Sequence, residues 1–483
     1  MKQVVIVGGG ITGLAAAYTL QEHARAAGTP VDCTLLEAGS RLGGSILTER
    51  ADGFVIEAGP DSFLSTKPWA LELCERLGLT ERLVGTNRAQ RAIYILSGDR
   101  LHPVPEGLVL LAPVHLGAFI RSPLLSMAGK ARMALDVILP RRHEGGDESL
   151  GAFVRRRLGR EVLEKLVAPL FAGIYAGQAD RLSLRSVFPR FCDLEQEYRS
   201  LILGLAAARR NRPNKPKNNE SRWTTFLTFR GGMTELVETL VGRLNAVAVR
   251  TGSQVRTVRP AEAGPSAGPV PDRGGYDVRL ADGRLLHADA VIVTTPAYAA
   301  AELLGDTDRP IAEHLRAIPY ASTATVSLGY RRAGFSHPLN GFGFVVPRTE
   351  GRRILACTWT STKFSRRAPP DSVLLRCFVG GAGTEAAVAQ DDDAIVKMVR
   401  DELRAIMGVL APPVLTRVYR WAQANPQYVV GHGDRLAAID VALAGHPGLF
   451  LAGSAYRGVG IPDCIHQGAV AADQTWRHLQ STG

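Results

Sequence analysis

The first forty residues alternate between apolar segments, glycines and a helical stretch. Residues 2–7 are mostly apolar, as in a strand that is buried on both faces of a parallel sheet. Glycines follow at once, then a stretch of helical composition over residues 14–21 and a second apolar strand over residues 32–36. This order of strand, glycine turn, helix and strand predicts a βαβ unit at the start of the chain.

The pattern beyond this unit changes twice. Residues 100–210 are mostly helical by pattern, with turns at Pro103, Pro105 and Pro140. Strands are expected again in the second half, over residues 248–258, 276–280, 290–294, 323–330, 343–346 and 373–379. The chain is therefore expected to be an α/β protein with a β-rich and a helical region inserted.

The last part of the chain returns to helical patterns. A helix is expected over residues 392–407, and a strand over 449–452 precedes a closing helix that starts near Cys464. The polar run 209–219 lacks an apolar period and is expected to be an exposed loop, and the Gly/Pro-rich run 261–275 is expected to be a loop between strands.

The glycines after the first strand fit the pattern GxGxxG with Gly8, Gly10 and Gly13. Gly8 allows a tight turn, Gly10 lets the backbone approach a pyrophosphate, and Gly13 lets helix and strand pack closely. The start of the helix then offers N–H groups and a positive dipole end to the phosphates. Glu37 ends the second strand 24 residues beyond Gly13, where an acid accepts from both ribose hydroxyls. The sequence therefore predicts a dinucleotide site.

The block after Glu37 separates FAD from NAD. Arg41 can neutralise pyrophosphate charge, while Gly43 and Gly44 permit close approach of the backbone. This block resembles the ExxxRxGG extension of flavoproteins of the glutathione-reductase and amine-oxidase type. NAD alone does not need the extension, so FAD is the expected cofactor.

Composition and charge narrow the partners only slightly. The chain has 483 residues, of which 46% are hydrophobic and 21% charged, as in a soluble globular enzyme. The excess of 57 Lys and Arg over 46 Asp and Glu gives a net charge of +11, which favours anionic partners. No nucleic-acid-binding module is recognised, so nucleic acid is not expected. The run at 209–219 is interpreted as a solvated connection.

The cysteines and apolar stretches predict a cytoplasmic protein. The six cysteines are scattered without metal-ligand spacing, which favours reduced thiols and no metal site. No signal peptide is expected, and the apolar stretch 108–120 is too short to span a bilayer. A seat on the inner membrane surface stays open.

Further blocks resemble the HemY-type protoporphyrinogen and coproporphyrinogen III oxidases. They fall in the same order as in that family and cover nearly the whole chain. The blocks are GPDSF at 59–63, FAGIYAG at 171–177, RSLI at 199–202, FRGGM at 229–233, GFG at 341–343, PQY at 426–428 and GVGIPDCI at 458–465.

The resemblance implies the amine-oxidase-like fold, with a Rossmann-like FAD-binding domain that is discontinuous in sequence. The expected FAD-binding parts are 1–86, 223–298 and 425–483. The β-sheet substrate domain is expected over 87–99 and 299–424, and a helical insertion, often tied to membrane contact in the family, over 100–222.

The resemblance also implies which residues bind the cofactor. Val255 is expected to contact the adenine end through its backbone, and the closing helix to point its N-terminus at the electron-rich edge of the flavin, where it would stabilise the reduced anion. The expected FAD-binding residues are Gly8, Gly9, Gly10, Ile11, Thr12, Gly13, Glu37, Ala38, Arg41, Gly43, Gly44, Gly59, Pro60, Asp61, Ser62, Val255, Val459, Gly460 and Ile461.

The implied reaction is the oxidation of a porphyrinogen to the porphyrin in haem biosynthesis. In the family hydride passes from the macrocycle to flavin N5 in three rounds, and oxygen reoxidises the flavin. Arg91 aligns with a propionate-binding arginine, a role that a guanidinium fork suits, and Gly341 and Phe342 are expected in the pocket wall. No catalytic acid or base is named. Hand-off of the product to a ferrochelatase is a further expectation, and the oligomeric state is left open.

Alternatives remain at this point. An amine or carotenoid oxidoreductase shares the FAD motifs, and a non-catalytic flavin-binding or scaffold protein is a second class. The PDCI-x-QG ending is more like the Gram-positive type, which slightly favours coproporphyrinogen III over protoporphyrinogen IX.

Several conspicuous side chains are interpreted as structural. His432 and His466 are expected to be structural or exposed rather than catalytic, and Cys464 is expected to pack. The cluster 155–157, together with Arg160, is expected to be a solvated helix face, with attraction to anionic lipid as the alternative.

Overall fold

The computed structural model describes residues 1–105, 108–109, 112–113, 122–142, 145–210, 222–261 and 274–482. Most of the apolar stretch 108–120 and of the two expected loops, 209–219 and 261–275, lies outside the described residues.

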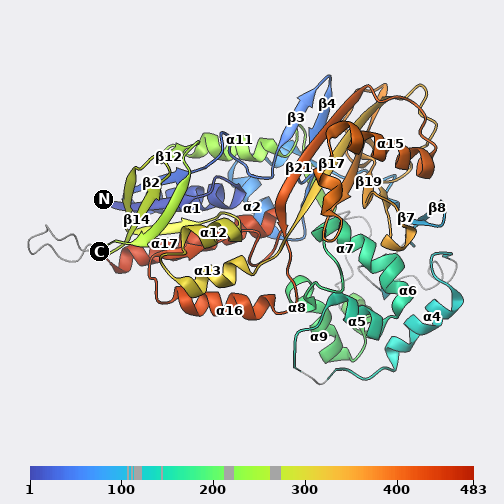
Figure 1. Cartoon of the computed structure of the whole chain (residues 1–483), viewed down its shortest axis with the longest axis horizontal. Coiled ribbons are helices and arrows are strands. Elements are labelled where there is room, and N and C mark those ends of the chain that lie inside the picture. The colour runs from blue at the N-terminus through green and yellow to red at the C-terminus, as the bar shows by residue number, and fades with distance from the viewer. Residues whose placement is uncertain are drawn as a thin grey trace, which may run out of the picture.

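Five parallel strands form the first sheet, at the left of Figure 1. Their order is β12 (Val247–Arg250), β2 (Val31–Leu36), β1 (Lys2–Val7), β16 (Ala290–Val293) and β22 (Leu449–Leu451). The central pair is in register from Val4 with Ala290 to Val7 with Val293. Strands that are hundreds of residues apart in sequence thus complete one sheet, which confirms the discontinuous α/β domain.

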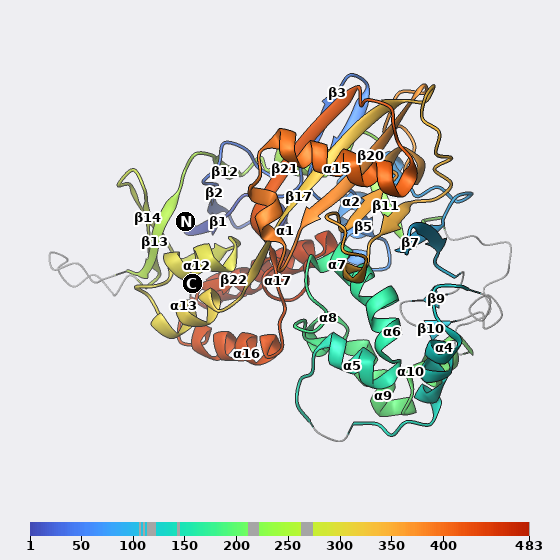
Figure 2. The same cartoon turned by 45° about the vertical axis from the view of Figure 1, so that its right-hand side comes forward.

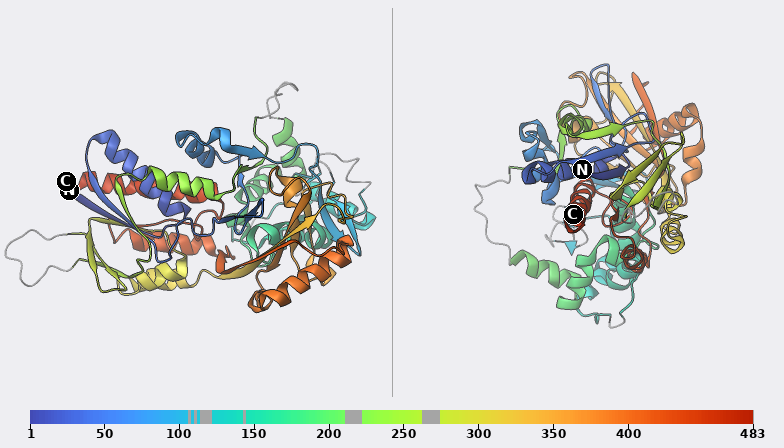
Figure 3. Two further views of the ribbon diagram at one scale, coloured as in Figure 1. Left: turned by 90° about the horizontal axis from the view of Figure 1, so that it is seen from above. Right: turned by 90° about the vertical axis from the view of Figure 1, so that its left-hand side faces the viewer.

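Helices cover both faces of this sheet. On one face α1 (Ile11–Ala27) and α17 (Ile461–Ser481) lie side by side with α11 (Thr234–Arg243) and α2 (Pro68–Arg76), as the view from above shows (Figure 3). The other face packs against α12 (Ala297–Leu303), α13 (Arg309–Arg316), α16 (His432–Leu443) and an antiparallel sheet of β13 (Val255–Pro260), β14 (Tyr276–Leu280) and β15 (Leu285–Ala288).

A second, seven-stranded sheet stands beside the first domain (Figure 2). Its order is β21 (Leu415–Pro426), β17 (Tyr320–Arg331), β20 (Ser372–Gly380), β19 (Ala356–Thr358), β18 (Gly343–Val345), β7 (Ile93–Ser97) and β8 (Arg100–Pro103). The amphipathic helix α15 (Asp392–Met407) buries Ile395, Val399 and Leu403 against it.

Short strands link the two sheets. The hairpin of β3 (Thr48–Ala51) and β4 (Phe54–Glu57) leads into β5 (Phe63–Leu64), which pairs with β11 (Phe226–Phe229), and β11 also pairs with β6 (Leu83–Gly85). Outside the main sheets lie a short strand pair, β9 (Leu108–Val109) with β10 (Ala112–Pro113), and the small helix α14 (Thr360–Lys363).

The third region is helical and lies below the second sheet in Figure 1. It has its own apolar cluster, which includes Phe153, Leu166 and Phe191. The helices are α4 (Met127–Ala134), α5 (Leu150–Arg157), α6 (Arg160–Val162), α7 (Ala168–Tyr175), α8 (Leu184–Val187), α9 (Pro189–Tyr198) and α10 (Leu201–Arg210).

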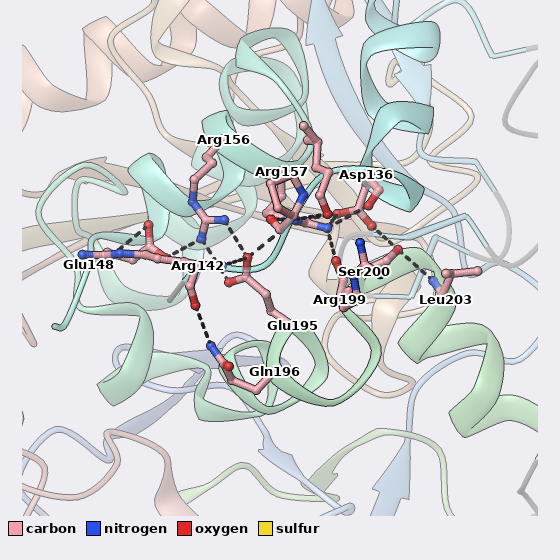
Figure 4. A network of polar contacts seen from close by, with 12 residues as sticks. Asp136, Arg142, Glu148, Arg156, Arg157, Glu195, Gln196, Arg199, Ser200 and Leu203 are labelled. Atoms are coloured by element: carbon pink, nitrogen blue, oxygen red, sulfur yellow. Dashed lines mark hydrogen bonds and ion pairs between the residues drawn. The ribbon is translucent and has the colours of Figure 1, made fainter. Parts of the chain in front are cut away.

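A buried ion-pair network holds these helices together (Figure 4). Arg157 is fully buried, and its guanidinium lies 2.6 Å from Asp136 Oδ1. Asp136 also accepts from the Ser200 hydroxyl at 2.6 Å, and Arg156 binds Glu195 at 2.6 Å. The expectation of a solvated helix face at 155–157 is therefore wrong for Arg157, which is fully buried, while Arg155 is exposed and Arg156 is partly exposed.

Some expected element limits differ from the structure. The helical region begins after a hairpin, since Arg100–Pro103 pairs with β7, so the expected limit between residues 99 and 100 falls inside that hairpin. The expected strand 248–258 is two strands, β12 and β13, which belong to different sheets. The domain limits themselves stay a prediction. No helix among the described residues is long and apolar enough to cross a membrane.

Candidate cofactor site and substrate pocket

The glycine turn lies between β1 and α1. Gly8 has φ +112°, and its N–H donates to the Leu36 carbonyl at 2.8 Å. A Cβ on Gly13 would lie 2.0 Å from the Gly8 carbonyl oxygen. Thr294, at the end of β16, donates its hydroxyl to the Gly8 carbonyl at 2.9 Å. Only glycine fits this contact between helix and strand.

Glu37 is held at the end of β2 by two backbone donors. Its Oε2 accepts from the Gly9 N–H and its Oε1 from the Gly39 N–H, both at 2.7 Å. Its carbonyl accepts from the Ser253 N–H at 2.8 Å, which places Val255 of β13 two residues further along the same segment. The remaining lone pairs of a carboxylate suit the hydroxyl donors of a ribose.

The second pair of glycines contacts the first turn. Gly43 donates to the Gly9 carbonyl at 2.8 Å, and a Cβ on Gly44, whose φ is +58°, would lie 3.3 Å from Gly10 Cα. Arg41 points its guanidinium at loop carbonyls, including those of Ile46 at 3.3 Å and Gly44 at 2.5 Å. Arg41 thus braces this loop, and its contact with pyrophosphate stays a prediction.

The start of α1 fits a pyrophosphate. Gly10 occupies the N-cap position, and no side chain caps this end of the helix. A Cβ added to Gly10 would meet no atom within 4 Å. The first turn, which includes Ile11 and Thr12, therefore leaves its N–H groups for an anion next to open space.

The segment 59–62 is fixed between the two sheets. A Cβ on Gly59 would lie 1.7 Å from the Ser45 carbonyl oxygen, and the Ala58 carbonyl accepts from Trp421 Nε1 at 2.8 Å. Arg376 donates to the carbonyls of Ala58 and Gly59. Pro60 follows in this segment. The backbone here is anchored by side chains that lie more than 300 residues away.

Asp61 is the charged member of this segment. Its carboxylate accepts from Lys363 Nζ at 2.8 Å and from the Ser62 hydroxyl at 2.6 Å. Burial opposes ionisation of Asp61, but the charges of Lys363 and Arg376 outweigh it and hold the pKa of Asp61 well below its usual range. Asp61 is therefore an anion at neutral pH.

Helix α17 begins beside α1. Gly460 is its N-cap without a capping side chain, and Ile461 is buried. A Cβ on Gly468, about two turns into α17, would lie 2.3 Å from the Thr12 carbonyl oxygen, so the first turn of α1 packs closely against α17. Val459 precedes this start. The two uncapped N-termini suit the pyrophosphate and a second electron-rich group of one extended cofactor.

A cavity of about 410 Å³ brings together two of the expected substrate residues, Arg91 and Phe342. Arg88, Trp223 and Phe226 also line it. Arg91 is exposed, and its Nε donates to the Arg88 carbonyl at 2.7 Å.

A close backbone contact fixes the cavity wall at Phe342. Phe342 N–H donates to the Ala92 carbonyl at 2.8 Å, and a Cβ on Gly341 would lie 2.3 Å from that same oxygen. Gly341 is buried and does not line the cavity, so it acts through this contact. The cavity adjoins the Asp61 segment, because Lys363 Nζ lies 5.5 Å from the ring centre of Phe226.

A larger cavity of about 620 Å³ lies between the second half of α1 and the first residues of β2 and β12. It lies at the amino ends of these strands, whereas the glycine turn follows the carboxyl end of β1. None of the expected site residues lines it. The smaller cavity is the better candidate for the substrate site, because it adjoins the cofactor segment and combines arginine with aromatic walls.

The residues judged structural are packed as expected. His466 stacks on Trp69 with ring centres 4.0 Å apart, and His432 stacks on Tyr428 at 4.2 Å. Burial raises the pKa of the Cys464 thiol to about 12, so Cys464 is not a reactive thiolate.

Sequence reasoning missed several side chains that shape the site. Thr294, Lys363, Arg376, Trp421 and Tyr428 each bind a segment expected to hold the cofactor, yet all come from distant elements. Thr294 carried one usable signal, since it ends a parallel strand on the edge where ligands bind. Tyr428 lay in the PQY block, but nothing in the sequence gave it a partner.

The comparisons with known proteins agree with this geometry. Residues 11–475 match the family described as flavin containing amine oxidoreductase. The chain belongs to this family. It is a flavoprotein, and FAD is its cofactor.

Within this flavoprotein family, the relatives are porphyrinogen oxidases. Coproporphyrinogen III oxidase of Bacillus subtilis is 40% identical over 99% of both chains. Chloroplastic protoporphyrinogen oxidase 1 of Arabidopsis thaliana is 32% identical over 95% of this chain and 85% of its own. These full-length matches place the flavoprotein in the porphyrinogen oxidase family.

Solved structures give the same fold. A protein of Exiguobacterium sp. 255-15, solved under the provisional name of protoporphyrinogen oxidase, has a TM-score of 0.84 and 35% identity over 99% of both chains. Putrescine oxidase has a TM-score of 0.65 at 15% identity over 99% of both chains, which shows the amine-oxidase fold alone.

Proposed function

We propose that this flavoprotein oxidises coproporphyrinogen III to coproporphyrin III with oxygen in haem biosynthesis. Its full-length similarity to coproporphyrinogen III oxidases carries the proposal. Three of these, from Bacillus subtilis, Propionibacterium freudenreichii and Staphylococcus aureus, are 40%, 35% and 34% identical to it. The chloroplastic protoporphyrinogen oxidases are 31% or 32% identical.

The residues of the first domain fit FAD. Gly8–Gly13 and the start of α1 would hold the pyrophosphate, Glu37 the ribose, and the start of α17 the flavin ring. Bound FAD supplies an acceptor for hydride from the macrocycle and passes the electrons to oxygen. The protein's own task is then to bind and orient a large flat substrate beside the cofactor and to exclude water.

The cavity beside Asp61 supports a porphyrinogen as the substrate. Trp223, Phe226 and Phe342 offer apolar and aromatic surface for a macrocycle, and Arg91 offers a guanidinium for a propionate. Coproporphyrinogen III carries four propionates and protoporphyrinogen IX two. A cavity with cations therefore favours coproporphyrinogen III, as does the 40% identity to the enzyme of Bacillus subtilis, although coproporphyrinogen III oxidase of Mycobacterium bovis is 32% identical, like the chloroplastic enzymes.

The test compares the two porphyrinogens under air with the purified holoenzyme. Porphyrin fluorescence and oxygen consumption are followed together, and the spontaneous rate is subtracted. A kcat/KM for coproporphyrinogen III that exceeds that for protoporphyrinogen IX at least tenfold supports the proposal. Equal values would remove the substrate preference, and oxidation of neither porphyrinogen would overturn the proposal.

Two controls separate the parts of the proposal. Putrescine tests the amine-oxidase alternative, which rests on fold alone. Reactions in air with and without an artificial electron acceptor test the role of oxygen. Turnover that requires the acceptor even in air would show that oxygen is not the oxidant.

The place of the protein in the cell is a separate proposal. We infer a cytoplasmic enzyme with peripheral contact to the membrane and hand-off of its product to a ferrochelatase. Exposed Met127 and Ile138 in the helical region support a contact with lipid. Co-sedimentation with anionic vesicles tests it, with vesicles of neutral lipid as the control.

A further inference from the structure

The hydroxyl of Tyr428 makes two backbone hydrogen bonds to the segment 453–460. It donates to the Ser454 carbonyl at 2.6 Å and accepts from the Gly458 N–H at 2.9 Å. This segment joins β22 to α17, so it delivers the chain to the uncapped helix start at Gly460. One buried side chain therefore fixes both ends of the turn that leads to the expected flavin contacts.

His432 supports Tyr428 from the next helix. The two rings are stacked with centres 4.2 Å apart and planes at 11°. His432 Nε2 lies 3.0 Å from the Tyr456 carbonyl, which can only accept, so Nε2 carries the proton. Burial lowers the pKa of His432, and the ring is neutral. The segment 453–460 is thus held by three hydrogen bonds from two stacked side chains.

The same part of the chain also contacts the helical region. The Tyr428 carbonyl accepts from the Ser183 N–H at 2.7 Å, and Gln427 Nε2 donates to the Tyr175 carbonyl at 2.8 Å. Gln427 and Tyr428 are both at most 5% exposed. The dipeptide therefore connects the end of α7 with the segment before α17.

We propose that Tyr428 is a positioning residue for the flavin, which holds Gly458 and the start of α17 in place and links them to the helical region. The proposal rests on FAD as the cofactor and is independent of which porphyrinogen is oxidised. The Tyr428 hydroxyl acts through the backbone of 453–460 and does not touch the reacting atoms.

The geometry around Gly458 explains why its position is sensitive. Gly458 has φ +120°, and a Cβ there would lie 2.5 Å from Asp463 Cγ in the first turn of α17. If the Gly458 backbone shifts in this direction, it therefore pushes against Asp463 in the first turn of α17. Without the Tyr428 hydroxyl, the Ser454 carbonyl and the Gly458 N–H lose their partner in a partly buried place, which favours such a shift.

The test replaces Tyr428 by Phe in the holoenzyme. We expect the FAD content to stay near that of the natural protein, the visible flavin spectrum to change, and the midpoint potential of the flavin to become more negative. The kcat should fall about tenfold, the loss that one net hydrogen bond represents, with KM changed less than twofold. The potential is measured without substrate, so failure of the proposed substrate does not affect it.

Tyr276→Phe is the matched control. The Tyr276 hydroxyl also donates to a backbone carbonyl, that of Pro447 at 3.0 Å, and the side chain is 3% exposed. Pro447 precedes β22, whereas the flavin segment follows it. This control should lose stability of the same order and leave flavin spectrum and potential unchanged.

An unchanged spectrum and potential in the Tyr428→Phe holoenzyme, or equal changes in the Tyr276→Phe control, would overturn the proposal. If Tyr428→Phe does not fold, hydrogen exchange of the natural holoenzyme decides. The Gly458 amide should then be protected to the same degree as the α17 amides, and rapid exchange of Gly458 would reject the assigned role.

Discussion

Lys67 Nζ lies 2.6 Å from both carboxylate oxygens of Asp463, in the first turn of α17. A carboxylate at a helix N-terminus competes with any other anion for the positive end of the dipole. The ammonium of Lys67 balances that charge where the reduced flavin is expected. The pair thus leaves the helix start available to the cofactor.

The Lys67→Gln variant should therefore make reduction of the flavin less favourable. The midpoint potential is expected to become more negative, and stability to fall by about 1 kcal/mol, because Lys67 is partly exposed. Lys67→Arg should restore most of the potential. Lys397→Gln, which breaks the exposed pair with Asp401, is the control and should change neither quantity. An unaltered potential in Lys67→Gln would separate this ion pair from the cofactor.

Gly13→Ala should abolish FAD binding while its effect on folding is smaller. Its Cβ would lie 2.0 Å from the Gly8 carbonyl oxygen, so the glycine turn must open. Gly242→Ala in α11 is the matched control, since its Cβ meets no atom within 4 Å. That change should stabilise the helix by about 1 kcal/mol. FAD content and thermal unfolding of both variants check the prediction, and full FAD loading of Gly13→Ala would contradict it.

Asp136→Ala should strongly destabilise the helical region. It removes the closer of the two carboxylates that pair with the fully buried Arg157 and leaves only Glu195 at 3.6 Å, and breaking comparable buried pairs costs about 3 to 5 kcal/mol. Arg160→Ala, which breaks an exposed pair with Glu164, should leave the midpoint of unfolding nearly unchanged. Denaturant unfolding measures both. Equal midpoints for the two variants would show that the buried network adds nothing.

The ionised Asp61 carboxylate should stabilise the folded protein near neutral pH, and this contribution should be lost in acid. Its folded pKa lies below its unfolded value of about 3.9, so its contribution is complete above that pH and is lost as the pH falls towards the folded pKa. The difference in unfolding free energy between the natural protein and Asp61→Asn should therefore shrink as the pH falls below about 4. Thermal unfolding from pH 3 to 7 measures it, and a constant difference would refute the assignment.

Arg91→Ala should raise KM for coproporphyrinogen III about tenfold, as expected for the loss of one charge-assisted hydrogen bond. FAD content should not change, because Arg91 lines the cavity and not the glycine turn. Arg332→Ala, an exposed arginine that follows β17, is the control and should keep the natural KM. Steady-state kinetics decide, and an unchanged KM in Arg91→Ala places Arg91 outside the substrate site.

The local parts of the cofactor site were predictable from the sequence. The turn at Gly8–Gly13, the acid at Glu37 and the glycines at 43 and 44 all lie within one βαβ unit and its extension. Their spacing is fixed by strand and helix geometry over a few tens of residues, so the pattern alone predicts the dinucleotide site.

Partners that meet across the fold were not predictable. The cluster at 155–157 has the pattern of an exposed face, but Asp136 and Glu195 from neighbouring helices pair with two of its arginines, and Arg157 is fully buried. Likewise the expected strand 248–258 divides between two sheets, since pairing partners and not local pattern assign a strand to a sheet.

The sequence by itself determined the cofactor, the family and the order of strand, turn and helix that begins the chain. Only the tertiary structure decided that Trp421 and Arg376 anchor the segment at Gly59, and that Tyr428 holds the approach to α17. The reason is physical. A backbone motif carries its geometry within itself, whereas the side chain that satisfies a distant carbonyl is selected by how sheets and helices pack.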